Sequence, residues 1–198
     1  MTIYDAATKT VATLDARETA PAASTTDMFK GDPEAAQHGA KSVAVPGEIA
    51  GYWAAKERYG NASITWRRLV EPTVAMCREG ITVSWTHHTT LYWYNFTNQK
   101  MQSVFHNPET GKPWVEGDIY QRPDYATTLE QLAEAGDRGE KDLGFYNGPV
   151  GRDFLADLQG NVATKDTVES DARNFRKIFA RDVRFLHHQC HDHDCSGT

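Results

Sequence analysis

The sequence lacks any run of 18 consecutive apolar residues, so it encodes no membrane-spanning helix of ordinary length. It also lacks a start in which a charged segment precedes an apolar one, so we expect no signal peptide within these residues. Lys and Arg number 21 against 27 Asp and Glu, and the formal net charge is −6. Because no cluster of basic residues occurs, the composition argues against a nucleic-acid partner.

Cysteine is also scarce. The three residues Cys77, Cys190 and Cys195 cannot form a framework of paired disulfides. Cys77 falls in an apolar helical pattern, which predicts a buried thiol. With 39% hydrophobic and 24% charged residues, the 198-residue chain has the composition of a globular protein with one domain, occasionally two.

Residue patterns predict short strands at the start of the chain. Strand-like segments at 2–4 and 11–14 predict a hairpin whose second strand ends just before Arg17. Residues 21–41, rich in Ala, Gly, Ser and Thr, predict a connecting loop. The apolar spacing over 48–59 then predicts a helix that ends at Gly60.

Helices are expected to dominate the middle of the chain. A helix that starts near residue 65 is expected to end or kink at Pro72, with another helix running to Gly80. Ser84 is a predicted N-cap for a helix that follows it. Residues 104–105 are expected to form a strand that leads into turns.

Two further helices are expected in the last part of this region. Asp124 is the predicted N-cap of a helix over 125–135, which Gly136 would close. Residues 148–158 carry apolar side chains on one side and predict another helix. The fold class expected from these patterns is a mixture of helices and short strands.

A series of short motifs runs along the chain in a fixed order. They are Arg17-Glu18-Thr19-Ala20-Pro21, Val43-Ala44-Val45-Pro46-Gly47-Glu48, Gly51-Tyr52-Trp53-Ala54, Leu69-Val70-Glu71-Pro72 after Trp66, Gly80-Ile81-Thr82-Val83-Ser84, Phe105-His106-Asn107-Pro108-Glu109-Thr110-Gly111 with Gly117-Asp118, Arg122-Pro123-Asp124 through Thr127-Thr128-Leu129-Glu130, Phe145-Tyr146-Asn147-Gly148 and Thr164-Lys165-Asp166. Each motif is common by itself, but their shared order is hard to explain by chance. In this order they resemble the large subunit of the gamma-glutamyltransferases, over about residues 1–166.

The resemblance implies a fold and a domain organisation. Members of the family adopt an alpha-beta-beta-alpha sandwich of the N-terminal nucleophile hydrolase type, so this α+β chain would form part of that sandwich, with a helix-rich middle. Residues 1–166 would be the large-subunit fragment. Residues 167–198 depart from the family pattern and are expected to form a divergent, disordered polar tail rich in His and Cys.

Arg17 is the candidate substrate-binding residue. The resemblance implies that the arginine of the Arg-Glu-Thr motif binds the α-carboxylate of the glutamyl substrate. A guanidinium suits this role because it carries a permanent charge and offers two parallel hydrogen bonds to a carboxylate. The alternative is that Arg17 only forms a surface ion pair with Glu18.

The resemblance also implies a reaction that this chain does not complete. The family cleaves γ-glutamyl bonds of glutathione and transfers the glutamyl group to water, amino acids or peptides. The nucleophile is a threonine of the small subunit, in a Thr-Thr-His stretch, whose freed α-amine acts as the base. Residues 86–90 read Thr-His-His-Thr-Thr, which is the wrong order, so His87 and His88 are expected to be exposed or partner-contacting positions.

The expected partners are therefore glutathione, other γ-glutamyl compounds and the small subunit of the same precursor, and no cofactor is implied. No catalytic residue is assigned to this chain, which is expected to be inactive alone. The alternative function is that of a non-catalytic, truncated binding chain. A third possibility is that the chain does not fold stably without the small subunit, because removing part of a shared sandwich leaves open strand edges.

Two sequons are candidate glycosylation sites, at Asn61 and Asn95. By resemblance, Met1 falls inside a family strand, so we expect the natural protein to begin upstream of it, with an anchor there. The parent protein would then lie on the extracellular face of the plasma membrane.

The tail contains several side chains that bind metals in other proteins. They are His187, His188, Cys190, His191, His193 and Cys195. A structural zinc site normally takes two pairs of ligands separated by a folded loop, whereas these six lie within nine residues. We therefore predict incidental metal affinity at most, and no dedicated metal site.

Overall fold

The computed structural model describes residues 1–21, 24–94, 99–140, 144–160 and 184–189. The chain divides into two compact units. The first contains Met1–Ile64 and Arg138–Thr198, and the second contains Thr65–Asp137.

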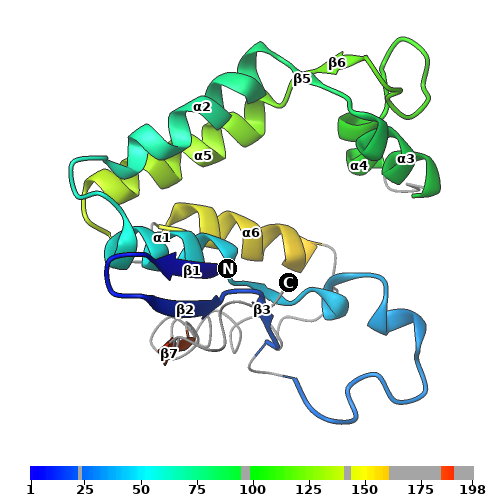
Figure 1. The fold of residues 1–198 in the computed structure, drawn as a ribbon. Helices are drawn as coiled ribbons and strands as arrows, with labels where there is room; N and C mark the ends of the chain where they lie inside the picture. The colour runs from blue at the N-terminus through cyan, green and yellow to red at the C-terminus, as the bar shows by residue number, and fades with distance from the viewer. Residues whose placement is uncertain (22–23, 95–98, 141–143, 161–183, 190–198) are drawn as a thin grey trace, which may run out of the picture. The chain divides into compact units, whose positions relative to one another are not determined.

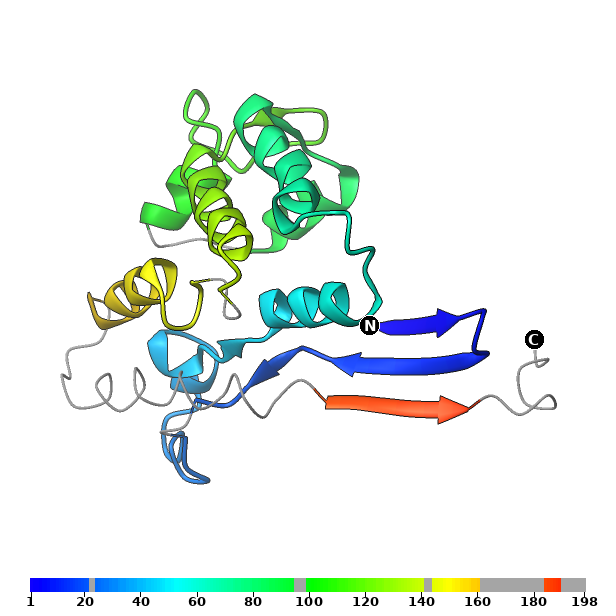
Figure 2. The same cartoon turned by 90° about the vertical axis from the view of Figure 1, so that its left-hand side faces the viewer.

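The first unit contains an antiparallel sheet in the order β1-β2-β7 (Figures 1 and 2). Strands β1 (Thr2–Asp5) and β2 (Thr10–Asp15) form the predicted hairpin, with the register Thr2↔Thr13 and Asp5↔Thr10. Strand β7 (Arg184–Gln189) pairs with the other edge of β2. Leu14 is only 1% exposed, so this end of β2 is anchored in the core just before Arg17.

β7 lies inside the segment 167–198 that was expected to be a disordered tail. Its six residues are a paired strand in the structure. The rest of that segment is outside the described residues, so the predicted boundary after residue 166 stays a prediction.

A second pair of strands carries the chain past Arg17. Strand β3 (Glu18–Thr19) pairs antiparallel with β4 (Val45–Pro46), with Glu18 opposite Pro46. The described part of the predicted connector between them contains the short 3₁₀ helices η1 (Glu34–Ala36) and η2 (Ala40–Ser42).

Two helices complete the first unit. Helix α1 (Glu48–Tyr59) has the predicted bounds and stops at Gly60, and α6 (Pro149–Gly160) follows the motif at residues 145–148. Val45 and Tyr146 form the centre of a small apolar cluster. Partly buried side chains pack against this pair, namely Ala50, Phe145, Phe154 and Leu155. The cluster joins β4, the start of α1 and α6.

The second unit is built on two long helices packed against each other. They are α2 (Trp66–Glu79) and α5 (Pro123–Asp137), and each carries buried side chains, among them Cys77 on α2 and Leu132 on α5. Strands β5 (Ile81–Thr82) and β6 (Ile119–Tyr120) pair antiparallel. Helix α3 (Trp85–Trp93) is N-capped by Ser84, as predicted: the Ser84 hydroxyl accepts a hydrogen bond from the His87 amide at 3.2 Å. Helix α4 is Gln99–Phe105.

Three local predictions in this unit fail, one of them only in part. Helix α2 continues through Pro72, so the expected end of a helix there is wrong, whereas the alternative of a kink stays a prediction. Pro72 is exposed, so the Arg68 carbonyl that loses its helical partner can be solvated by water. Residues 104–105 end α4 instead of forming a strand, although the turns that follow are present, with a bridge between His106 and Pro113.

The third error concerns the ends of α5. The helix begins one residue before Asp124, with Pro123 at its first position, where proline loses no helical hydrogen bond. At the other end, Gly136 lies inside the helix and is buried. We attribute the burial of this glycine to the close packing of α5 in its unit, and packing of that kind is not visible in a local pattern.

Among the described residues, no helix is long and apolar enough to cross a membrane. The architecture as a whole combines helices with short strands, which is the mixed class that the sequence predicts.

Candidate functional site

Arg17 lies in the short bend between β2 and β3. Its main chain is fixed on both sides: the amide of Arg17 donates to Asp15 Oδ1 at 3.4 Å, and its carbonyl accepts from the amide of Gly47 at 2.8 Å. Next to it, Glu18 is in register with Pro46. The hairpin and the start of α1 therefore hold the backbone of Arg17 between them, as the sequence predicts for the hairpin.

The side chain of Arg17 is 85% exposed. Its Nε donates to Glu18 Oε2 at 3.0 Å, and within the described residues this carboxylate is the one partner recorded for the guanidinium. The ion pair with Glu18 thus exists, but it contributes little because both groups are largely solvated. It uses one edge of the guanidinium and leaves the two terminal nitrogens for a further carboxylate.

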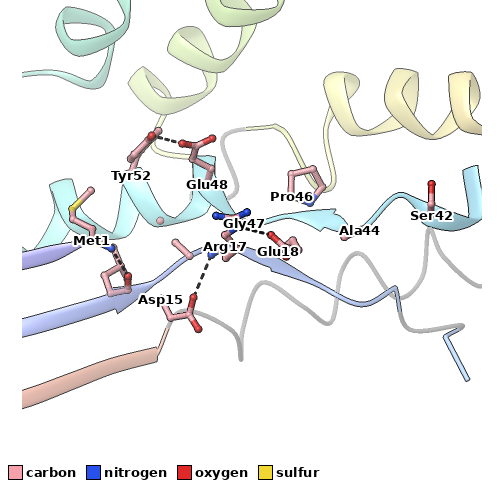
Figure 3. A pocket seen from close by; sticks show the side chains of 13 residues that line it. Met1, Asp15, Arg17, Glu18, Ser42, Ala44, Pro46, Gly47, Glu48 and Tyr52 are labelled. Atoms are coloured by element: carbon pink, nitrogen blue, oxygen red, sulfur yellow. Dashed lines mark hydrogen bonds and ion pairs between the residues drawn. The ribbon is translucent and has the colours of Figure 1, made fainter. Parts of the chain in front are cut away.

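Arg17 lines a pocket of about 980 Å³ (Figure 3). The lining comes from the end of β2, from β3, from the residues before α1 and from the first turns of α1. It consists of Met1, Leu14, Asp15, Ala16, Arg17, Glu18, Ser42, Ala44, Pro46, Gly47, Glu48, Gly51 and Tyr52. The volume is within the range of small-molecule sites.

The charges in the pocket are unequal. Asp15, Glu18 and Glu48 are acidic, and Arg17 is the one basic side chain among the described residues that line it. Glu48 opens α1, where the positive end of the helix dipole favours its charge, and it accepts a hydrogen bond from the hydroxyl of Tyr52 one turn later. A zwitterionic ligand with a carboxylate for Arg17 and a cation for the acidic groups fits this distribution.

Glu48 and Tyr52 are not among the site residues that the sequence predicts. Their spacing of four residues on a predicted helix, directly after Pro46-Gly47, would have placed them on one face. The spacing does not show that this face of α1 lies close to Arg17. That proximity comes from tertiary contacts between α1 and the end of β2.

His87 and His88, the two histidines of the Thr-His-His-Thr-Thr stretch, lie in the second unit. His88 Nδ1 is 3.2 Å from the carbonyl oxygen of Trp114, and the His87 ring meets the Tyr120 ring edge-on at 5.5 Å. Both histidines are half-buried, so the expectation that they are exposed is wrong, whereas the alternative that they contact a partner chain stays a prediction. The structure gives both of them partners within their own unit, which is the behaviour of structural histidines.

The described part of the chain contains no group of three or more His, Cys, Asp or Glu side chains placed to hold a metal. Of the tail candidates, His187 and His188 belong to β7, and the four others lie outside the described residues. Cys77 is a free thiol and only 2% exposed, as predicted.

The two sequons differ in what the structure describes. Asn61 is exposed, and its Oδ1 accepts hydrogen bonds from the amide and hydroxyl of Ser63 at 2.9 and 2.8 Å. Asn95 lies outside the described residues. Glycosylation at either position stays a prediction.

Comparison with known proteins gives a consistent result. A model of the gamma-glutamyltranspeptidase family matches residues 1–185. The chain is 34% identical over 183 residues to scoloptoxin SSD14 of Scolopendra dehaani, and 35% identical over 161 residues to glutathione hydrolase 3 of Arabidopsis thaliana. These matches cover 90% and 79% of this chain.

Solved structures agree with the sequence matches. The structure resembles gamma-glutamyltranspeptidase from Helicobacter pylori with a TM-score of 0.73 and 25% identity, over 93% of this chain. The enzyme from Pseudomonas nitroreducens gives a TM-score of 0.67 at 24% identity, which supports the fold alone.

The chain is much shorter than these proteins. It spans 30% of the scoloptoxin, 24% of the Arabidopsis protein and 50% of the Helicobacter chain. The residues described here therefore correspond to one portion of a longer polypeptide in each relative.

Proposed function

Because this chain belongs to the gamma-glutamyltranspeptidase family and matches its large-subunit portion, we propose that it is part of a glutathione hydrolase and γ-glutamyltransferase. In this proposal the enzyme cleaves the γ-glutamyl bond of glutathione and transfers the glutamyl group to water, amino acids or peptides. The observation that carries the proposal is the exposed guanidinium of Arg17, a residue that lines a pocket of small-molecule size.

Arg17 binds the α-carboxylate of the glutamyl group in this proposal. The terminal nitrogens donate to no group among the described residues, and the bend between β2 and β3 fixes the backbone from which they project. Two parallel, charge-assisted hydrogen bonds then select a donor that has a free carboxylate at this position.

Acyl transfer itself requires groups outside the 198 residues. The sequence contains no Thr-Thr-His stretch, and we propose that a threonine of the small subunit supplies the nucleophile. The complete enzyme would have the alpha-beta-beta-alpha sandwich of the N-terminal nucleophile hydrolases, to which β1, β2 and β7 contribute. Residues 1–166 would be the large-subunit fragment, and the parent protein would act on the extracellular face of the plasma membrane.

The test begins with the reading frame. Sequencing of the transcript across the codons for Thr164 to Thr198 and beyond shows whether a Thr-Thr-His stretch follows. If it does, the complete product is purified free of host enzyme and assayed with a chromogenic γ-glutamyl amide. If the frame stops after Thr198, the alternative of a non-catalytic binding chain replaces the enzyme.

Arg17→Met tests the assigned role within the complete product. Loss of charge-assisted hydrogen bonds worth about 1.5–3 kcal/mol should raise the KM for the donor by about 10- to 150-fold. Arg152→Met is the matched control, since Arg152 is exposed on α6 and does not line the pocket. A donor whose α-carboxylate is converted to an amide should bind the wild type and Arg17→Met alike. Equal KM values for the ordinary donor in wild type and Arg17→Met would refute the assignment.

A further inference from the structure

Two glycines lie at the start of α1, four residues apart. Gly47 is the N-cap and Gly51 is a buried residue in the second turn of the helix. Gly47 has φ −102° and ψ −11°, and Gly51 is in helix, so any residue type can adopt either conformation. Backbone conformation therefore does not explain why glycine occupies these positions.

Space does explain it. A Cβ atom at position 47 would lie 2.3 Å from the carbonyl oxygen of Arg17 and 3.0 Å from that of Ala16. A Cβ atom at position 51 would lie 2.2 Å from the Cβ of Ala16. The atoms that would be struck are main-chain atoms and a methyl group, and none of them can rotate away as the end of a long side chain can.

The same two glycines fix the Arg17 backbone directly. The amide of Gly47 donates to the Arg17 carbonyl at 2.8 Å, a contact that the missing side chain makes possible. Gly51 lets the helix lie against Ala16, the residue immediately before Arg17. Figure 3 shows the bend of Arg17 against the first turns of α1, with Glu48 and Tyr52 on the same helix.

We propose that Gly47 and Gly51 are positioning residues for Arg17. They allow α1 to contact the Ala16–Arg17 backbone, which sets the place of the guanidinium relative to Glu48 and Tyr52 in the pocket. The proposal rests on the proposed function, in which Arg17 binds the donor carboxylate. A methyl group at position 51 displaces Ala16, moves Arg17 with it and weakens donor binding.

The experiment moves one methyl group across the contact. Gly51→Ala adds the clashing Cβ, Ala16→Gly removes its partner, and the double variant exchanges the two. In the double variant the nearest remaining atoms are the Cα of Ala16 at 3.6 Å and Leu14 Cδ2 at 4.0 Å, which are ordinary contacts. The number of methyl groups is the same as in the wild type.

The variants are made in the complete translation product that contains this chain. Donor binding is measured as the dissociation constant for glutathione by NMR of the arginine side chains, and as KM and kcat where the product is active. Gly51→Ala is expected to weaken donor binding by about tenfold or more, with kcat changed less than about twofold. The double variant should recover most of the donor binding that Gly51→Ala alone loses, because the methyl group at position 16 that would be displaced is removed.

Arg17→Met, run beside them, separates two kinds of failure. If Arg17→Met binds the donor as the wild type does, the proposed function fails. If Arg17→Met is impaired and folded Gly51→Ala is not, the positioning role is wrong. The role is also wrong if Gly51→Ala lowers kcat alone, or if the double variant folds with the wild-type Tm and still binds weakly. Should Gly51→Ala fail to fold, the double variant alone decides between these outcomes.

Discussion

Replacement of Tyr146 by Phe tests how the turn before α1 is held. The Tyr146 hydroxyl donates to the carbonyl oxygen of Pro46 at 2.5 Å, across 100 residues of sequence, and the residue is 4% exposed. Phe retains the ring within the apolar cluster, so the change removes the hydrogen bond and leaves the Pro46 carbonyl without this donor. We expect the free energy of unfolding of the first unit to fall by about 1–2 kcal/mol.

The same residue predicts a dependence on pH. Burial raises the pKa of Tyr146 to about 12, from an ordinary value of 10.0. Because the folded-state pKa lies above the unfolded-state value, the contribution to stability is complete below about pH 10 and is lost as the pH rises towards 12. The difference of about two pKa units corresponds to a few kcal/mol, on the order of 3 kcal/mol.

Two assays measure these effects on the full chain. Urea unfolding at pH 8, followed by tryptophan fluorescence, measures the loss of the hydrogen bond in the transition that includes Trp53, the tryptophan of the first unit. The same measurement between pH 9 and 11.5 tests the pH dependence, because Tyr146→Phe should lose less stability over this range than the wild type. A pH titration followed by tyrosinate absorbance should show one fewer tyrosine that ionises at high pH in Tyr146→Phe than in the wild type. Tyr120, whose pKa is also raised by burial, still ionises late in both proteins.

The reasoning is refuted if Tyr146→Phe unfolds at the wild-type urea concentration at pH 8. It is also refuted if wild type and variant lose stability in parallel from pH 9 to 11.5. Tyr120→Phe is a suitable control, since it removes a tyrosine of the second unit and should leave the Trp53 transition unchanged.

Two predictions concern the second unit. Pro72→Ala should raise the free energy of unfolding of α2 by about 1–3 kcal/mol, because Pro72 is exposed inside a continuous helix, and a urea midpoint that does not rise would contradict that helix. Arg78 and Glu130 form a two-bond ion pair at 3.2 and 2.6 Å between α2 and α5, with side chains 48% and 37% exposed. A double-mutant cycle with Ala should give a coupling of about 0.5–1 kcal/mol that shrinks in 1 M salt, and a coupling insensitive to salt would count against a solvent-exposed pair.

Local patterns predict several elements in each of the two units. The hairpin, the bounds of α1 and the Ser84 cap follow from alternation, apolar spacing and capping preferences, all of which act over a few residues. The same local rules fail at Pro72 and at Gly136. At Pro72, an exposed position in α2 outweighs the low helix preference of proline. At Gly136, burial within the unit outweighs the low helix preference of glycine.

The sequence by itself determined the family, through the order of its motifs, and the presence of an arginine after a strand. Only the tertiary structure brought Gly47 and Gly51 against Ala16 and Arg17, and placed the hydroxyl of Tyr146 on Pro46. These contacts join segments that are about 30 and 100 residues apart in the sequence. No local preference encodes them, because they form only when the segments pack against each other in the folded unit.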